Sequence, residues 1–279
     1  MKVGVIGAGT MGSGIAQAFA VTDGYEVVLC DITEEFAAGG KKKIEKSLTK
    51  LVSKGKMEQE KADAILAKIT TGLNDKVADC DLVVEAALEK MDLKKELFAK
   101  LQTICRKDAI FASNTSSLSL TEMSQGLDRA IVGMHFFNPA PVMKLVEVTA
   151  GLHTAPETVE KIVAISKEIG KTPVEVKEAP GFVVNRILIP MINEGCELVY
   201  SGVASVEDVD KAMKLGANHP MGPLELGDLV GLDVCLAIMN TLYTETGDSK
   251  YRPSLLMKKM VRAGYLGRKT GKGFYDSSK

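Results

Sequence analysis

His135 and Glu147 are the two residues of this 279-residue chain whose types and positions best suit proton-transfer chemistry. His135 ends an apolar strand, and Glu147 stands between Val146 and Val148 in another. An isolated carboxylate within an apolar strand is costly unless it is paired. Prolines between the two runs exclude a helix there, so the second strand can return beside the first. A carboxylate on one imidazole nitrogen leaves the other as a general base near neutral pH.

The alternative interpretation of these two residues is a buried structural ion pair or a satisfied core histidine, because such pairs also perturb pKa values. The other two histidines, His153 and His219, lie in predicted loops and lack such a carboxylate neighbour. We therefore interpret both of them as structural.

A glycine-rich segment near the first residue suits a dinucleotide. The letters VGVIGAGTMG predict a strand, then a GxGxxG loop with Gly7, Gly9 and Gly12, then a helix. Such glycines permit a tight turn, a close approach of pyrophosphate, and close helix–strand packing. A second predicted strand ends at Asp31, which can accept hydrogen bonds from an adenine ribose and repel a 2′-phosphate. No arginine at positions 30–33 offers that phosphate a cation, so NAD is preferred to NADP. A glycine turn and a helix-capping aspartate are the alternative.

Residues 41–56 hold seven lysines and one acidic residue. Lys46, Lys50 and Lys54 recur every four positions, which predicts one lysine-bearing helix face. The residues predicted to pack inward from the opposite face are Ile44, Leu48 and Leu51. A polyphosphate partner would explain why so many like charges lie together. A solvated helix face is the alternative.

The segment 114–117 (Asn-Thr-Ser-Ser) directly follows another predicted strand. Ligand sites in open parallel sheets lie at the carboxyl ends of strands, so these hydroxyls and the amide can face a cofactor. Turn chemistry explains the same residues equally well.

Elements that could position these residues alternate along the first half of the chain. The predicted strands are Val3–Ile6, Val27–Leu29, Leu82–Val84, Ile110–Ala112, Ile131–Val132 and Thr172–Lys177. Helical stretches lie between them, the last being Pro156–Ile169. This alternation predicts a parallel sheet with helices on both faces.

The pattern changes near residue 182, after a turn signal at residues 179–181. Only helices are predicted beyond it: Asn185–Tyr200, Val206–Leu215, Leu224–Tyr243 and Ser254–Arg262. Ser205 is the predicted N-cap of the second, with Asp208 three residues on. We therefore predict an α/β domain over residues 1–181 and an all-α domain over residues 182–279.

Composition excludes several other functions. With 35 basic and 36 acidic residues the net charge is −1, so no overall field attracts nucleic acid or an anionic membrane. No apolar run approaches the roughly 20 residues of a membrane span. Five scattered cysteines without a CxxC pair indicate reduced thiols in a cytoplasmic protein, and no histidine lies at ligand spacing from them. No metal site is expected.

Together these motifs resemble the 3-hydroxyacyl-CoA dehydrogenase family, and most of all its short bacterial 3-hydroxybutyryl-CoA dehydrogenases. The resemblance runs from end to end of the chain. The motifs that carry it are GAGTMGSGIAQ (7–17), NTSSL (114–118), HFFNPAPVMKLVEV (135–148), PGFVVNR (180–186) and NHPMGPLELGDLVGLD (218–233).

The resemblance implies an N-terminal NAD-binding Rossmann-like domain and an all-α C-terminal domain that forms a homodimer. It implies interconversion of (3S)-3-hydroxybutyryl-CoA and acetoacetyl-CoA, with His135 as catalytic base and Glu147 orienting it. Ser116 and Asn185 are implied to hydrogen-bond the substrate. The implied cofactor contacts are Gly7, Gly9, Thr10, Met11, Gly12, Asp31, Glu89, Lys94, Ser116, Asn138 and Lys269. The implied coenzyme A contacts are Ser47 and Lys54, with Lys50 as their neighbour.

Two other functions compete with this one. A dehydrogenase of free 3-hydroxyacids shares the nucleotide motif but generally uses a lysine, and the basic helix and the His135/Glu147 pair argue against it. A non-catalytic structural relative, such as a lens protein, is the second. The intact set of His135, Glu147, Ser116 and Asn185 argues against that.

Overall fold

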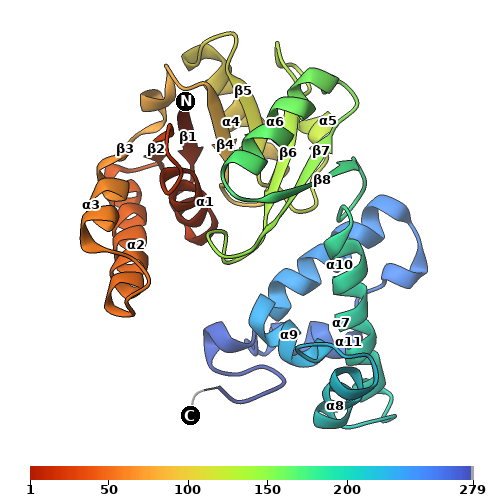
Figure 1. Cartoon of the computed structure of the whole chain (residues 1–279). Coiled ribbons are helices and arrows are strands. Elements are labelled where there is room, and N and C mark those ends of the chain that lie inside the picture. The colour runs from red at the N-terminus through yellow and green to blue at the C-terminus, as the bar shows by residue number, and fades with distance from the viewer. Residues whose placement is uncertain (278–279) are drawn as a thin grey trace. The chain divides into compact units, whose positions relative to one another are not determined.

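The computed structural model describes residues 1–277 (Figure 1). The chain divides into two compact units, Met1–Glu178 and a second that begins at Ala179. The first is a sheet covered by helices and the second is helical. The predicted fold class, a mostly parallel sheet followed by an all-α part, is confirmed.

Among the described residues the strands form one eight-stranded sheet in the order β3-β2-β1-β4-β5-β6-β7-β8. The strands are β1 (Lys2–Ile6), β2 (Glu26–Cys30), β3 (Ile69–Gly72), β4 (Leu82–Glu85), β5 (Ile110–Ser113), β6 (Ile131–Phe136), β7 (Leu145–Ala150) and β8 (Thr172–Lys177). Among the described strands of this sheet only the β6–β7 pairing is antiparallel. The carboxyl ends of β1, β4, β5 and β6 therefore lie at one edge, where ligands of such sheets bind.

The helices of the first unit cover both faces of this sheet. They are α1 (Thr10–Ala20), α2 (Glu34–Ser53), α3 (Gln59–Ala67), the 3-10 turn η1 (Asn74–Val77), α4 (Met91–Ile104), α5 (Leu120–Met123) and α6 (Pro156–Glu168). One buried cluster joins residues of α1, α2, α3 and α6 to the sheet, and a second joins residues of α4 and α5 to its other face.

Alternation along the strands explains the two clusters. Val3 and Val5 of β1 lie in the cluster that contains Phe19, whereas Ile6 lies in the cluster that contains Phe98. Successive side chains of a strand point to opposite faces, so a strand covered on both sides is apolar throughout. Each fully buried side chain of this size contributes about 1.5–3 kcal/mol relative to an exposed one.

The second unit is built from helices around its own apolar cluster. Its elements are α7 (Val184–Tyr200), α8 (Val206–Gly216), α9 (Pro223–Val230), α10 (Leu232–Thr246), η2 (Ser249–Tyr251), α11 (Leu255–Arg262) and η3 (Arg268–Thr270). The predicted cap of α8 is confirmed, because the Ser205 side chain accepts a hydrogen bond from the Asp208 amide at 3.1 Å.

The predicted single helix Leu224–Tyr243 is wrong. The chain breaks at Gly231, whose φ of 103° a side chain would disfavour, and α9 and α10 are bent by 98° there. Over residues 1–277 no single helix has the length and apolarity of a membrane span, and this bent pair meets that criterion only jointly.

β3 and α3 are absent from the predicted elements. Both lie in the polar stretch after α2, and β3 is four residues long with only its end residues buried. Such a strand has too few apolar positions to show a period of two.

Candidate functional site

The glycine loop after β1 has the shape of a phosphate cradle. Gly7 has a φ of 101°, and a Cβ on Gly12 would clash with the Gly7 carbonyl oxygen. A Cβ on Gly9, by contrast, would meet no atom within 4 Å, so the backbone faces open space there. Gly9 is the N-cap of α1 and supplies no side-chain cap, which leaves amides of the first turn available to an anion. The loop therefore fits a dinucleotide pyrophosphate.

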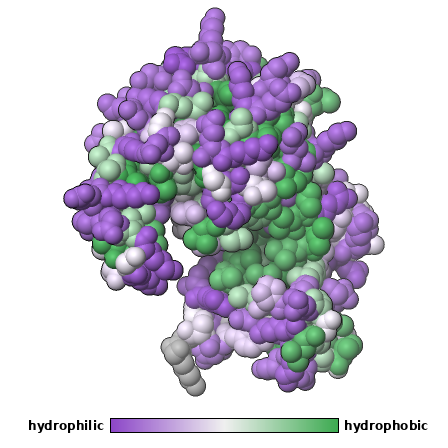
Figure 2. Space-filling view, in the orientation of Figure 1, coloured by the Kyte–Doolittle hydropathy of each residue, from purple (hydrophilic) through white to green (hydrophobic). Residues whose placement is uncertain are grey.

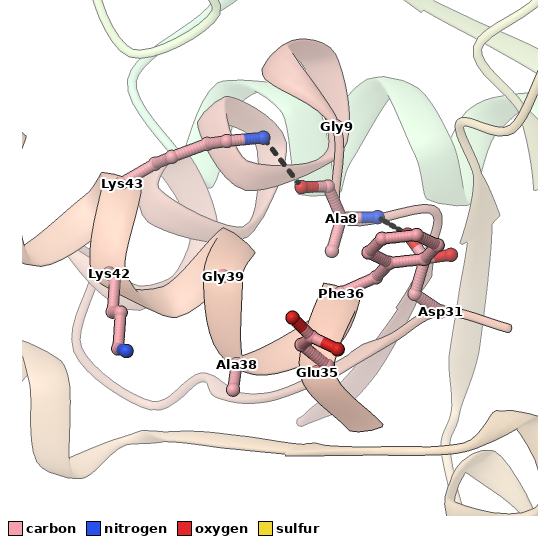
Figure 3. A pocket seen from close by; sticks show the side chains of 9 residues that line it. All are labelled: Ala8, Gly9, Asp31, Glu35, Phe36, Ala38, Gly39, Lys42 and Lys43. Carbon is pink, nitrogen blue, oxygen red and sulfur yellow. Dashed lines mark hydrogen bonds between the residues drawn. The ribbon is translucent and has the colours of Figure 1, made fainter. Parts of the chain in front are cut away.

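A pocket of about 500 Å³ opens beside this loop (Figure 3). It is lined by Ala8, Gly9, Asp31, Glu35, Phe36, Ala38, Gly39, Lys42 and Lys43. Asp31 accepts a hydrogen bond from the Ala8 amide at 2.6 Å, which ties the second strand to the glycine loop. Figure 3 shows the Glu35 side chain on the α2 side of this pocket, opposite the loop.

The lysines of this pocket correct one expectation. We expected a 2′-phosphate to find no cation near Asp31, because positions 30–33 carry none. Lys42 and Lys43 of α2 nevertheless line the same pocket as Asp31, and Lys43 Nζ lies 3.3 Å from the Ala8 carbonyl oxygen. The helix returns past the end of β2, so a search of adjacent positions misses these residues.

The His135–Glu147 pair lies at the next part of the sheet edge. The two residues are directly opposite in the antiparallel β6–β7 register, so their side chains leave the same face. His135 Nδ1 is 2.8 Å from Glu147 Oε2, and the residues are 6% and 1% exposed. The His135 ring also packs against Phe137, with 4.5 Å between ring centroids. With Nδ1 held by the carboxylate, Nε2 is the ring nitrogen that would take part in a proton transfer.

Glu89 holds the segment that follows β5. Its Oε1 accepts hydrogen bonds from the Thr115 hydroxyl at 2.6 Å and the Ser116 amide at 2.8 Å. Lys94 Nζ lies 3.2 Å from Glu89 Oε2. Desolvation acts to raise the pKa of Glu89, but the Lys94 ammonium and the bonds from Thr115 and Ser116 hold that pKa below its ordinary value. Glu89 is therefore an anion that organises residues 114–118, which we call the Ser116 loop.

Two further contacts complete this edge. Asn114 Oδ1 accepts a hydrogen bond from the Phe136 amide at 2.8 Å, so the amide that could have faced a cofactor joins the loop after β5 to the end of β6. Glu85, at the end of β4, is fully buried against Lys94 and the Ser113 hydroxyl.

The structure separates the predicted coenzyme A contacts of α2. Ser47 and Asn138 line one pocket of about 210 Å³ between α1, α2 and the loop after β6. Lys50 instead lines a shallow depression on the exposed face of α2, and Lys54 caps the carboxyl end of that helix. The predicted inward packing of the opposite face is confirmed for Ile44 and Leu48, which are 1% and 0% exposed.

Two predicted site residues belong to the second unit. Asn185 lies in the first turn of α7, and Lys269 lies in η3 with its Nζ 2.5 Å from Asp233 Oδ1. The residues brought together within the first unit are thus those of the glycine loop, the Ser116 loop and the His135–Glu147 pair.

Sequence reasoning placed Lys42 and Lys43 in the basic segment 41–56 without assigning them to a pocket beside Asp31, and it did not single out Glu35 or Glu85. Glu85 carried a usable signal, because a carboxylate that ends the apolar strand LVVE needs a partner just as Glu147 does. Lys42 and Lys43 carried the signal of that lysine-rich segment, which does not show which of its residues line a pocket, and Glu35 carried none.

Known proteins share both units. The family model "3-hydroxyacyl-CoA dehydrogenase, NAD binding domain" matches residues 2–179, and "3-hydroxyacyl-CoA dehydrogenase, C-terminal domain" matches residues 181–277. A 3-hydroxybutyryl-CoA dehydrogenase of Clostridioides difficile is 54% identical over 100% of both chains. A mitochondrial hydroxyacyl-coenzyme A dehydrogenase of Homo sapiens is 46% identical over 98% of this chain and 90% of its own. The crystal structure of an (S)-3-hydroxybutyryl-CoA dehydrogenase of Ralstonia eutropha has a TM-score of 0.95 and 49% identity, covering 100% of this chain and 99% of that one.

Proposed function

The chain belongs to the 3-hydroxyacyl-CoA dehydrogenase family, and we propose that it is an NAD-dependent oxidoreductase that interconverts (3S)-3-hydroxybutyryl-CoA and acetoacetyl-CoA. The observation that carries the chemistry is the contact of His135 Nδ1 with Glu147 Oε2 at the sheet edge that also bears the glycine loop. A proton-transfer group and a dinucleotide cradle on one edge are what an alcohol–ketone interconversion requires.

His135 acts as general base in oxidation and general acid in reduction. Its Nε2 takes the proton of the C3 hydroxyl, and the Glu147 carboxylate stabilises the imidazolium that results. In the opposite direction the imidazolium returns that proton to the carbonyl oxygen. Because Glu147 is almost fully buried, its charge is poorly screened by solvent and acts strongly on the ring.

NAD supplies the hydride chemistry at C3 when it is bound. The glycine loop would hold its pyrophosphate, and Asp31 would accept hydrogen bonds from its adenine ribose. Glu89, Lys94, Ser116, Asn138 and Lys269 are the further contacts that we assign to it. Glu89 and Lys94 also act through the Ser116 loop, which they hold in place.

Ser116 and Asn185 are the residues to which we assign the acyl chain. A hydrogen bond from each would orient C3, and such positioning is worth several kcal/mol, up to about 7–11. Ser47, Lys50 and Lys54 are assigned to coenzyme A, Ser47 from within a pocket and the two lysines from the exposed surface of α2.

A spectrophotometric assay of NADH oxidation tests this function. The purified protein should oxidise NADH with acetoacetyl-CoA and far more slowly with free acetoacetate. Equal rates with the two substrates would favour a dehydrogenase of free acids. The absence of turnover with either, in a folded protein that binds NADH, would favour a non-catalytic relative.

The second unit supports a homodimer as part of this proposal. It exposes large apolar side chains, among them Ile187 at 68%, Val203 at 69% and Leu215 at 80%, and Figure 2 shows apolar residues (green) on its surface. Exposed apolar surface of this kind favours association with a like surface. Light scattering should give about twice the chain mass of 29.9 kDa, and a mass equal to one chain would contradict the dimer.

We place the enzyme in the cytoplasm. All five cysteines are free and buried, which suits a reducing compartment. Cell fractionation with the same assay tests this, and activity confined to a secreted or membrane fraction would overturn it.

A further inference from the structure

We propose that Glu85 is a positioning residue, which fixes the Ser116 loop through Lys94 and Glu89. Glu85 ends β4, pairs with Ser113 in the β4–β5 register and is 0% exposed. It lies at the carboxyl edge of the sheet, opposite Ile6 of β1 and Ser113 of β5 in the strand registers. The inference deepens the proposed function, because it rests on the role of Ser116 in that reaction.

The Glu85 carboxylate is held by three donor groups, from Lys94, Ala87 and Ser113. Its Oε1 lies 2.5 Å from Lys94 Nζ and accepts the Ala87 amide at 2.6 Å, while its Oε2 accepts the Ser113 hydroxyl at 2.5 Å. Lys94 is 1% exposed, so its ammonium is shielded from water and depends on the carboxylates of Glu85 and Glu89 for its charge partners. A buried ammonium with two fixed acceptors has one low-energy position.

Lys94, fixed in this way, in turn holds Glu89. Its Nζ lies 3.2 Å from Glu89 Oε2, and the other oxygen of Glu89 accepts the Thr115 hydroxyl and the Ser116 amide. The Ser116 hydroxyl also lies 3.3 Å from that oxygen. Of the three residues Glu85, Lys94 and Glu89, Glu89 is the one that is partly exposed, with its side chain 36% exposed. Without Lys94 it would be held only by its bonds from Thr115 and Ser116.

Glu85 therefore restrains the Ser116 loop at two points. It holds Ser113, the last residue of β5, directly, and it holds Ser116 through Lys94 and Glu89. The loop leaves the sheet beside β6, where His135 stands. A displacement of about 1 Å at such a loop can lower a rate up to about 100-fold.

The variant Glu85→Gln tests the relay, because it keeps the shape of the side chain and removes its charge. In the protein without cofactor we expect faster hydrogen–deuterium exchange of the backbone amides of residues 114–118. In assays of the same preparation with NADH added, we expect kcat for acetoacetyl-CoA to fall about 10- to 100-fold. The double variant Glu85→Gln/Glu89→Gln should be worse than Glu89→Gln alone, because Glu85 also holds Ser113 directly, but by less than the sum of the two single losses, because part of the effect of Glu85 runs through Glu89.

Asp81→Asn is the matched control. Asp81 precedes the same strand at the opposite edge of the sheet, where it accepts the Lys2 amide at 2.7 Å and pairs with Arg106 at 2.8 Å. The variant Asp81→Asn, like Glu85→Gln, removes a charged hydrogen-bond acceptor. We expect it to have a lower melting temperature, with native hydrogen–deuterium exchange of residues 114–118 and native kcat. If Glu85→Gln behaves as Asp81→Asn does, Glu85 is a structural residue only and the relay is overturned.

A second variant keeps the test decisive should Glu85→Gln fail to fold. Glu85→Met/Lys94→Met replaces the whole buried pair with apolar groups of similar length, a change that proteins often tolerate. We expect a folded protein whose residues 114–118 exchange faster, and native exchange there would overturn the relay. The exchange measurement needs no turnover, so it separates failure of the relay from failure of the proposed function, which would leave the native protein inactive toward acetoacetyl-CoA.

Discussion

Two regions of the first unit carry their charges in opposite ways. Along α2 the lysines are mostly exposed, and the surface over α2 and α3 in Figure 2 is largely hydrophilic. At the carboxyl edge of the sheet, Glu85, Lys94, His135 and Glu147 are all at most 6% exposed, and each has a charged or hydrogen-bonding partner. The first region can rearrange around a ligand, whereas the second is fixed before a ligand arrives.

This difference separates binding from chemistry. An exposed lysine far from the reacting carbon holds ground state and transition state equally, so it should act on KM. A buried group whose protonation changes during the reaction acts on the transition state alone, so it should act on kcat. The following substitutions test that division, beginning with the largest expected effect.

His135→Gln should reduce kcat by about 10²–10⁴-fold, the usual worth of general acid–base catalysis. Glutamine retains size and hydrogen-bonding capacity but has no proton to exchange near neutral pH. Binding of NADH, followed by its fluorescence, should be almost unchanged. A loss of NADH binding as large as the loss of kcat would place His135 in the cofactor site and would remove it from the chemistry.

Glu147→Gln should also lower kcat, by less than His135→Gln, because a neutral amide no longer stabilises the imidazolium. The decisive measurement is the double-mutant cycle on kcat with His135→Gln. If the pair acts as one unit, the double variant should be little worse than His135→Gln alone. Additive losses would show that Glu147 has an independent structural role.

Asp31→Ala should lower kcat/KM for NADH by roughly 10- to 100-fold, because hydrogen bonds to a charged group contribute about 1.5–3 kcal/mol. Asp31→Ala should also reduce the difference in kcat/KM between NADH and NADPH, since Lys42 and Lys43 line the same pocket and can face a 2′-phosphate. In the triple variant Asp31→Ala/Lys42→Ala/Lys43→Ala, kcat/KM for NADPH should no longer improve relative to that for NADH. Native enzyme with equal kcat/KM for the two cofactors would contradict the role of Asp31.

Much of the sheet unit could be predicted because its strands are covered on both faces. A doubly covered strand is apolar throughout, and each short β-branched run therefore stood out from the sequence. β3 did not, because only the end residues of its four are buried. The break at Gly231 was missed for another reason: a glycine within an apolar helical run is tolerated in many helices, and only the observed φ reveals the corner.

The candidate site was predictable where a charge stood in an apolar setting. Glu147 was found by that signal, and Glu85 could have been, since both need a partner in the low dielectric of the sheet. The partner itself is a matter of register and helix placement, which is why Lys94 could not be paired with Glu85 from sequence. The pocket lysines Lys42 and Lys43 are set by how α2 returns past the glycine loop, and no local pattern encodes that approach.

The smallest effect is expected on the exposed side of the comparison. Lys50→Ala/Lys54→Ala should raise KM for acetoacetyl-CoA roughly 2- to 10-fold and leave kcat nearly native, because exposed charge pairs contribute about 0.2–1 kcal/mol each. The increase should shrink with added salt, which screens exposed charges, and with a truncated thioester that lacks the nucleotide. Lys100→Ala/Lys107→Ala is the matched control, since it removes the same charge from exposed positions on and just beyond α4, against the other face of the sheet. A specific role for α2 requires that the control leave KM unchanged. An equal rise in both would mean that the net charge of the protein, rather than the α2 lysines, attracts the anionic substrate.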